Sequence, residues 1–279
     1  MYSGTTMTKF SGRILGAHQK FDRVARNHLR KVAGHELRFP SKRDILRYEG
    51  KNGPDGIKRK SPAQDEPWHY YSPFDKEDAG LLELIQEHYD NLVDQLRRDN
   101  NESAAFEAAW LAHAIVDGLT PAHHYPYEQE LVNLRGGLPI EDRTTIFKKI
   151  IMPGQSTKER LKNNWKMWGP KGLITTHGLF EFGIATLIAP LGFGEAVPNH
   201  EDLDTLEEIG YLEWFQRSAR EIAAMEMYDR YYRTGWTPKL AHQVRHVLGA
   251  TIVKSVTLVW YSACIDAEVI IPHAEKKRI

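Results

Sequence analysis

The stretch from Trp110 to His124 constrains this chain most, because it reads as an apolar helix whose buried face carries groups that prefer water or a metal. His113 and Asp117 are four residues apart, so on a helix they project from the same face. Pro121 then follows the end of the helix, and the chain can bend His123 back toward the pair. Two interpretations stay open on this stretch alone: a metal site, or a buried His–Asp hydrogen bond beside a loop histidine.

The composition limits which kinds of site are possible. The chain has 279 residues, 37 Lys and Arg against 37 Asp and Glu, and a single cysteine, Cys264. This excludes an intrachain disulfide and thiolate zinc fingers, so any metal site must use histidine and carboxylate ligands. Thirteen histidines are present to supply them. Because the net charge is zero, the overall charge does not favour nucleic-acid binding. Any positively charged surface that binds phosphate must be local.

Helical periodicity dominates the chain, and no convincing alternating strand pattern is found. We therefore expect an all-α fold, a single multi-helix domain over residues 1–279. Helices are expected over residues 13–32, 41–48, 75–98, 101 or 103 to 117, 141–151, 156–168, 173–191 (with a possible interruption near Gly183), 205–232 and 238–270, and a loop over 50–67.

Two late apolar stretches, Leu173–Phe193 and Val247–Ile271, contain charged or titratable residues that a membrane span would tolerate poorly. We expect buried helices there. The first ten residues have no apolar core of the kind a signal peptide needs. As written, the chain is expected to be cytoplasmic, or secreted if a leader has been removed.

Histidines followed by an acid four residues later are more frequent than chance predicts. With 37 acids in 279 residues, thirteen histidines should give one or two such pairs, and the chain has five. His113/Asp117 and His177/Glu181 lie in strongly apolar stretches, where an unpaired buried charge would cost several kcal/mol. A metal ion or a tightly paired network would compensate. His200/Asp204, in a polar stretch, is expected to be solvated surface.

The segment His113-Ala-Ile-Val-Asp117-Gly-Leu-Thr-Pro-Ala-His123 resembles the central motif of the zinc-dependent phospholipase C and fungal zinc nuclease superfamily. The resemblance continues in order along the chain. It covers eight positions: His18, Asp55, His69, His113, Asp117, His123, His177 and Glu181. The last hundred residues are supported only by their helical character.

The resemblance implies an all-helical fold that holds two or three Zn²⁺ ions. One zinc would take Asp55, His69, His113 and Asp117; a second would take His123, His177 and Glu181; a third would take His18 and share Asp117. Imidazole and carboxylate are suitable zinc ligands. The implied reaction is hydrolysis of a phosphoester, with Asp55 orienting or deprotonating the attacking water.

The chain departs from the family at two places. The family's third zinc uses the N-terminal residue, usually Trp, whereas seventeen residues precede His18 here and no Trp occurs before Trp68. We hypothesise that Asp22, one helical turn after His18, substitutes. The second departure is an insertion at about 125–172, basic toward its end (Lys148–Lys166), which either covers the cleft, contacts a phosphate-rich substrate or is a structural flap. His124 remains an alternative to His123.

The sequence thus predicts a zinc-dependent phosphoesterase acting on a phospholipid or on a nucleic acid or nucleotide. The alternative is a non-catalytic zinc-binding scaffold or interaction protein. Base stacking would need an aromatic beside the cleft, and four tyrosines are candidates: Tyr70, Tyr71, Tyr125 and Tyr127. No obligate protein partner is evident, and the oligomeric state stays open.

Overall fold

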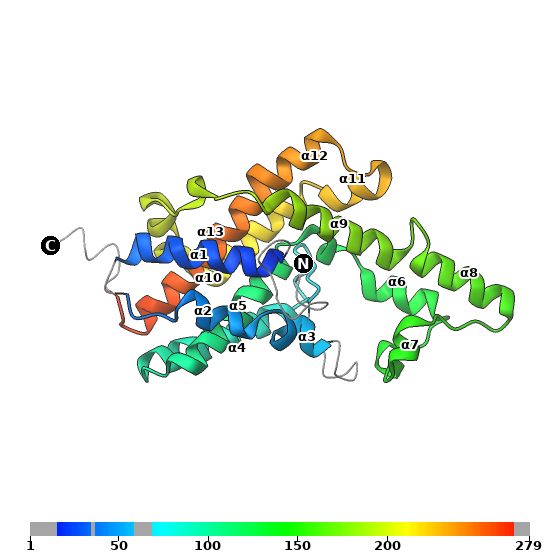
Figure 1. The fold of residues 1–279 in the computed structure, drawn as a ribbon, viewed down its shortest axis with the longest axis horizontal. Coiled ribbons are helices and arrows are strands. Elements are labelled where there is room, and N and C mark those ends of the chain that lie inside the picture. The colour runs from blue at the N-terminus through cyan, green and yellow to red at the C-terminus, as the bar shows by residue number, and fades with distance from the viewer. Residues whose placement is uncertain (1–15, 35–36, 59–68, 271–279) are drawn as a thin grey trace.

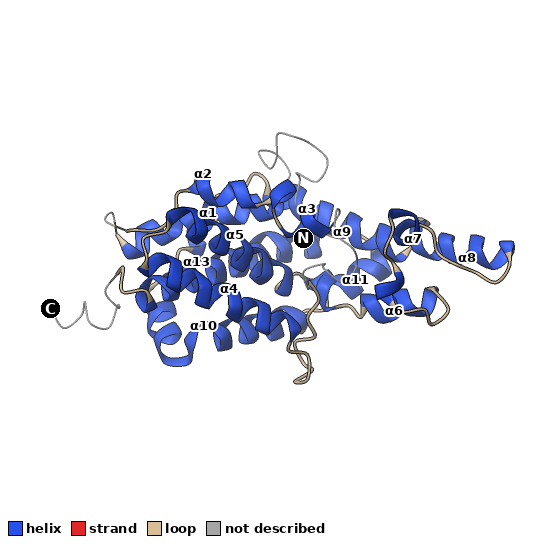
Figure 2. Cartoon of the chain, turned by 90° about the horizontal axis from the view of Figure 1, so that it is seen from below, coloured by secondary structure: helices blue, strands red, loops and turns tan. Residues whose placement is uncertain are grey.

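The computed structural model describes residues 16–34, 37–58 and 69–270, and these residues form helices and loops without strands (Figures 1 and 2). The all-α prediction is confirmed. The α-helices are α1 (Ala17–Ala33), α2 (Lys42–Ile45), α3 (Pro54–Lys58), α4 (Gly80–Arg97), α5 (Asn101–Gly118), α6 (Tyr127–Leu134), α7 (Ile146–Ile150), α8 (Thr157–Trp168), α9 (Leu173–Ile188), α10 (His200–Ala223), α11 (Met227–Thr234), α12 (Pro238–Gln243) and α13 (Gly249–Asp266).

Helix α13 lies at the centre of the main hydrophobic core, packed against α1, α10, α4 and α5 (Figure 1). Its Trp260 is fully buried, and the indole N–H donates to the carbonyl of Ala108 on α5 at 3.1 Å. Together with α12 and the π-helical segment Val244–Leu248 it is long and apolar enough to cross a membrane, but 72% of its most apolar window is buried inside the fold. The core helix of a soluble protein has the same character.

Helix α5 approaches its neighbours closely because one residue after another on it is small. The buried residues of its first three turns include Ala104, Ala105, Ala108 and Ala109. At its end, a Cβ on Gly118 would lie 2.5 Å from Cζ of Phe215. Glycine at 118, the last residue of α5, therefore leaves room for the side chains of Phe215 and Leu81 directly after the His–Asp pair.

Several expected elements differ from the structure: the helix expected over 75–98 begins only at Gly80, and of the helix expected over 141–151 only Ile146–Ile150 is α-helical. The expected loop over 50–67 contains α3, which Pro54 favours because proline suits the first turn of a helix; the rest of that loop lies outside the described residues. Helix α9 continues through Gly183, where the ring of Trp236 packs so closely that a Cβ would meet it at 2.3 Å. The helix expected over 205–232 ends at Ala223 and resumes as α11 after Glu226, which has a left-handed φ of 48°.

The predicted insertion forms a projecting part of the molecule around a small core of its own. Helices α6, α7 and α8 extend away from the main helical body (Figure 1). The buried members of this second core are Tyr127, Leu131, Met152 and Met167. Helix α9 runs from this part back into the main core and contacts both α8 and α1.

Candidate metal centre

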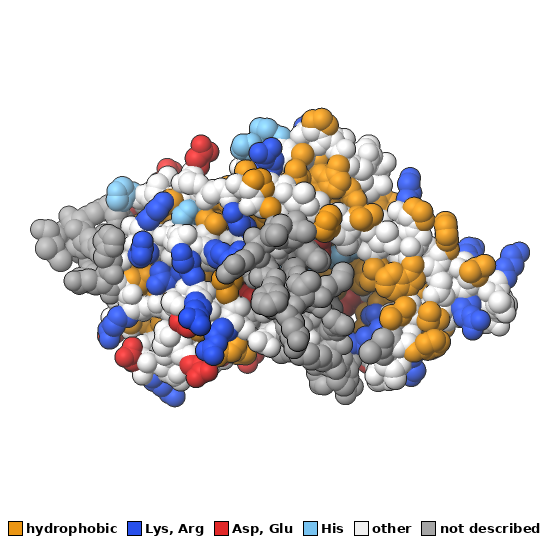
Figure 3. All heavy atoms as spheres, in the orientation of Figure 1, with side chains coloured by type: hydrophobic (Ala, Val, Ile, Leu, Met, Phe, Trp, Pro, Cys, Tyr) orange, Lys and Arg blue, Asp and Glu red, His pale blue; other side chains and the backbone are white. Residues whose placement is uncertain are grey.

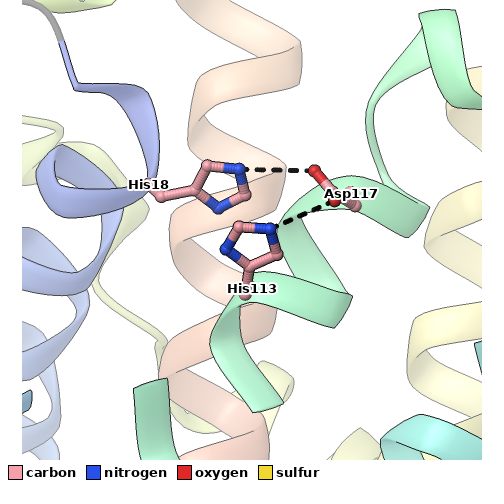
Figure 4. Close-up of side chains that lie close together, drawn as sticks. All are labelled: His18, His113 and Asp117. Atoms are coloured by element: carbon pink, nitrogen blue, oxygen red, sulfur yellow. Dashed lines mark ion pairs between the residues drawn. The ribbon is translucent and has the colours of Figure 1, made fainter. Parts of the chain in front are cut away.

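The carboxylate of Asp117 is fully buried and lies among imidazoles from three separate segments. Nε2 of His18, on α1, is 3.3 Å from Oδ1, and Nε2 of His113, one turn earlier on α5, is 3.3 Å from Oδ2. Nδ1 of His69 also contacts Oδ2. Figure 4 shows the rings of His18 and His113 lying face to face with both directed at this carboxylate. Their centroids are 3.8 Å apart.

The eight residues predicted as ligands all fall into groups that could hold a metal ion. The potential ligand atoms within each group lie within 4.8 Å of one another, and the groups are His18/His113/Asp117, Asp55/His69/His113 and His123/His177/Glu181. The members come from α1, α3, the segment at residue 69, α5, the 3-10 turn Pro121–His124 and α9. Residues far apart in the sequence thus converge on one region, with His113 shared by two groups.

The group formed by His123, His177 and Glu181 is held together by short contacts. Nε2 of His123 and Nε2 of His177 lie 2.8 and 3.0 Å from the same oxygen of Glu181. Nδ1 of His123 donates to the backbone carbonyl of His69 at 2.8 Å. This hydrogen bond sets the ring orientation and directs Nε2 toward Glu181 and His177, which is how proteins commonly orient a histidine that binds a metal.

Asp55 is the carboxylate of the centre that solvent reaches most easily. Its side chain is 23% exposed, against 12% for Glu181 and 0% for Asp117. Oδ1 of Asp55 lies 3.8 Å from Nε2 of His113. Asp55 therefore lies at the more exposed edge of the centre.

Glu49 is a buried residue of the centre that the sequence did not point to. Its carboxylate lies 3.3 Å from Nδ1 of His113 and accepts a hydrogen bond from the backbone N–H of Gly50. It therefore holds the His113 ring with Nε2 toward Asp117 and Asp55, the orienting role of a carboxylate behind a metal-binding histidine. No histidine precedes it at helical spacing, and its nearness to Asp55 in the chain is the one available signal.

The charges of the centre are mutually dependent. Burial alone would raise the pKa of Asp117, but neighbouring groups that can carry positive charge, the imidazoles of His123, His113 and His18 among them, hold that pKa well below its usual value. Burial alone would lower the pKa of His113, but Glu49 and Asp117 together raise it well above its usual value. A cation stabilised by these carboxylates is what the site favours, and a bound metal would displace the proton from His113.

The pKa of Asp55 is also lowered, although burial acts in the opposite direction. The imidazoles of His113 and His18 are responsible, so Asp55 is ionised near neutral pH and can accept a proton.

Two further predictions concern Asp22 and His124. Asp22 is buried on α1, and neither of its carboxylate oxygens has a hydrogen-bond partner among the described residues, yet it belongs to none of the three groups. Nε2 of His124 donates to the carbonyl of Gly118 at 2.8 Å, and burial lowers the pKa of this imidazole to about 4. His124 thus stabilises the end of α5, and His123 is the histidine that faces the centre.

Two of the four candidate tyrosines flank the centre. The rings of Tyr70 and Tyr127 are stacked at 5.3 Å, Tyr70 lies 5.5 Å from the ring of His123, and Tyr127 lies 5.6 Å from that of His177. Tyr71 instead packs in the main core against Phe215. The centre therefore has one aromatic side, formed by Tyr70 and Tyr127.

No family model, curated protein or solved structure matches this chain. The chemistry of the site must therefore be argued from its own residues. The donor set contains only imidazole nitrogen and carboxylate oxygen, which suits divalent transition metals. In addition, Nε2 of His113 is buried and forms no well-aligned hydrogen bond, although it faces two carboxylates. The residues present fit bound metal ions.

Proposed function

We propose that this chain is a zinc-dependent phosphoesterase that hydrolyses a phosphodiester or a phospholipid ester bond at a centre of two or three Zn²⁺ ions. One observation carries the proposal: eight histidine and carboxylate residues from six segments meet in three adjoining groups. The order of these residues along the chain is that of the phospholipase C and zinc nuclease superfamily, which uses such a centre for phosphoester hydrolysis.

The imidazole ligands favour a transition metal over Mg²⁺ and Ca²⁺, which prefer sites built from oxygen alone. We propose zinc because the superfamily that the ligand order resembles uses it. Bound zinc would stabilise the negative charge of the phosphoryl group and lower the pKa of a nearby water.

The chain's own residues have separable roles in this proposal. Asp55, ionised and partly exposed, accepts the proton of the attacking water. Asp117 fixes the relative positions of His18, His69 and His113 from the centre of the cluster. Tyr70 and Tyr127 form an apolar side on which the group attached to the phosphate can rest.

The proposal is tested with zinc-loaded protein and bis-p-nitrophenyl phosphate, phosphatidylcholine, and single-stranded DNA and RNA as substrates. We expect hydrolysis of the p-nitrophenyl ester and of at least one natural substrate, lost on chelation and restored by zinc. His88→Gln is the matched control, because His88 is a buried histidine bonded to Glu107 outside the three groups.

Metal binding without turnover of any of these substrates would contradict the proposal. That result would instead favour the non-catalytic zinc-binding scaffold, because the centre would then be intact but inert.

A further inference from the structure

The face of α8 that points away from the small core is both apolar and exposed. Leu161 and Trp165 are 72% and 68% exposed, and Trp168 is exposed beside them. These residues are spaced by four and three, so they form one stripe along the helix. The opposite side of α8 is held by Met167, which is fully buried. Water therefore covers a continuous apolar stripe that the described part of the chain leaves unpartnered.

Lysines lie directly beside this stripe. Lys158, Lys162 and Lys166 each follow at a spacing of four, and each is exposed. Since neighbouring residues are about 100° apart around a helix, this row adjoins the row of Leu161 and Trp165. The result is an amphipathic surface of the kind that lies in a membrane interface, with apolar side chains beside cationic ones.

Helix α7 extends the same surface. Phe147 and Ile150 are exposed on it, and the indole N–H of Trp168 donates to the carbonyl of Ile150 at 2.7 Å, which ties α7 to α8. We name residues 146–168 the α7–α8 arm. In Figure 3 this end of the molecule shows exposed hydrophobic side chains together with Lys and Arg side chains at its tip.

The charge of the α7–α8 arm is concentrated and positive in a chain that is neutral overall. It contains six Lys and Arg residues and one acid, Glu159. That acid has a local structural role: its carboxylate accepts from the backbone N–H of Gln155, and its own N–H donates to Ser156 at the start of α8. The arm therefore carries an excess of five positive charges over its single acid.

We propose that the α7–α8 arm docks onto an anionic lipid surface. Negative lipid headgroups complement the lysines, and the hydrocarbon boundary accepts Leu161, Phe147 and Ile150. A single-stranded nucleic acid would use the lysines and the tryptophans, but aliphatic side chains offer bases no stacking surface.

The test measures co-sedimentation of the full chain with vesicles of phosphatidylcholine alone and of phosphatidylcholine with phosphatidylglycerol at three to one. We expect binding to the anionic vesicles that weakens with salt. Replacing the three lysines (Lys158→Gln, Lys162→Gln, Lys166→Gln) should reduce it on the order of 100-fold. Replacing Leu161 and Trp165 by serine should reduce it roughly 10- to 100-fold.

The matched controls change the same residue types elsewhere. Lys42→Gln with Lys76→Gln and Lys239→Gln removes three exposed lysines, and Phe74→Ser removes a side chain that is 70% exposed. Both controls should bind like the wild type. All substituted side chains are exposed, so circular dichroism should show unchanged folding.

Arm variants that bind anionic vesicles as tightly as the wild type would overturn the inference. So would a wild type that ignores vesicles but binds a single-stranded oligonucleotide through the three lysines. Binding requires no turnover, so the two proposals fail separately. A chain that binds vesicles and hydrolyses nothing would contradict only the proposed function. One that hydrolyses bis-p-nitrophenyl phosphate without binding vesicles would contradict only the docking surface.

Discussion

Helix α5 takes part in two histidine–carboxylate arrangements, one partly buried and one fully buried, that differ in what surrounds them. Near its start, Glu107 receives a hydrogen bond from His88 of α4 at 2.7 Å, and the two side chains satisfy each other. Near its end, one carboxylate, Asp117, is faced by the imidazoles of His18, His69 and His113. The His88–Glu107 pair needs no further partner. Asp117, with three imidazoles around it, has the surroundings of a metal ligand.

The comparison shows that His–acid spacing on one helix carries little information alone. His88 and Glu107 are on different helices, and His113 and Asp117 are one turn apart on the same helix, yet an acid lies beside a histidine in both. The two arrangements differ because α1, α3 and α9 bring further histidine and carboxylate side chains close to the second one. The predictions below alter one arrangement and use the other as its control.

The largest effect is expected from Asp117→Asn. The amide cannot neutralise a cation, and Asp117 contacts histidines of two groups, so two zinc ions should weaken together. Hydrolysis should fall roughly 1,000-fold, because a metal ion contributes several kcal/mol of transition-state stabilisation. Elemental analysis after dialysis measures the metal, and bis-p-nitrophenyl phosphate measures the activity.

Two further variants sharpen this result. His123→Ala should remove a single zinc, because His123 belongs to one group only, and Glu107→Gln should remove none. Loss of the same single metal from Asp117→Asn and His123→Ala would show that Asp117 does not link two sites.

The next effect is expected from Asp55→Asn. The amide can no longer accept the proton of the attacking water, so kcat should fall about 100- to 10,000-fold. Since Asp55 is also a potential ligand, zinc content is measured in parallel. A variant that keeps its zinc and its kcat would exclude Asp55 as the base.

A smaller effect is expected from Glu49→Gln, because Glu49 acts through the ring of His113 and not on the metal itself. Zinc affinity should fall about 10- to 100-fold. Competition with a chromogenic chelator measures this, and unchanged affinity would leave Glu49 without a part in the centre.

The smallest effect concerns His28, a buried histidine on α1 with no carboxylate partner among the described residues. Burial and the charge of Lys31 lower its pKa to about 4. Between pH 6.5 and 4 the unfolded chain therefore binds a proton that the folded chain excludes, and the free energy of unfolding decreases as the pH falls. His28→Gln should flatten this decrease in urea titrations; an unaltered slope would be the contrary result.

The sequence predicted the part of the structure that depends on local pattern. Helical periodicity was sufficient for the all-α fold, and the helix expected over 156–168 is found as α8, Thr157–Trp168. Local pattern did not place Glu49, because its role depends on the tertiary approach of its turn to α5. It also did not show that α9 continues through Gly183. Glycine is needed there because the ring of Trp236, from a distant segment, leaves no room for a Cβ.

The same limit applies to the first of the two late apolar stretches of the chain. Residues 173–193 were expected to form a buried helix, yet α9 leaves Leu179 and Phe182 exposed while Phe180 and Ile184 are buried. Composition identified an apolar helix, but only the fold determines which of its faces is covered.

The central claim is that the eight converging residues form a metal centre, and zinc stoichiometry tests it most directly. Zinc-loaded protein, dialysed against metal-free buffer, is measured by elemental analysis beside the Asp117→Asn and Glu107→Gln variants. We expect two or three zinc ions per chain in the wild type and in Glu107→Gln, and at least two fewer in Asp117→Asn. Less than one zinc per wild-type chain, or equal zinc in all three proteins, would contradict it.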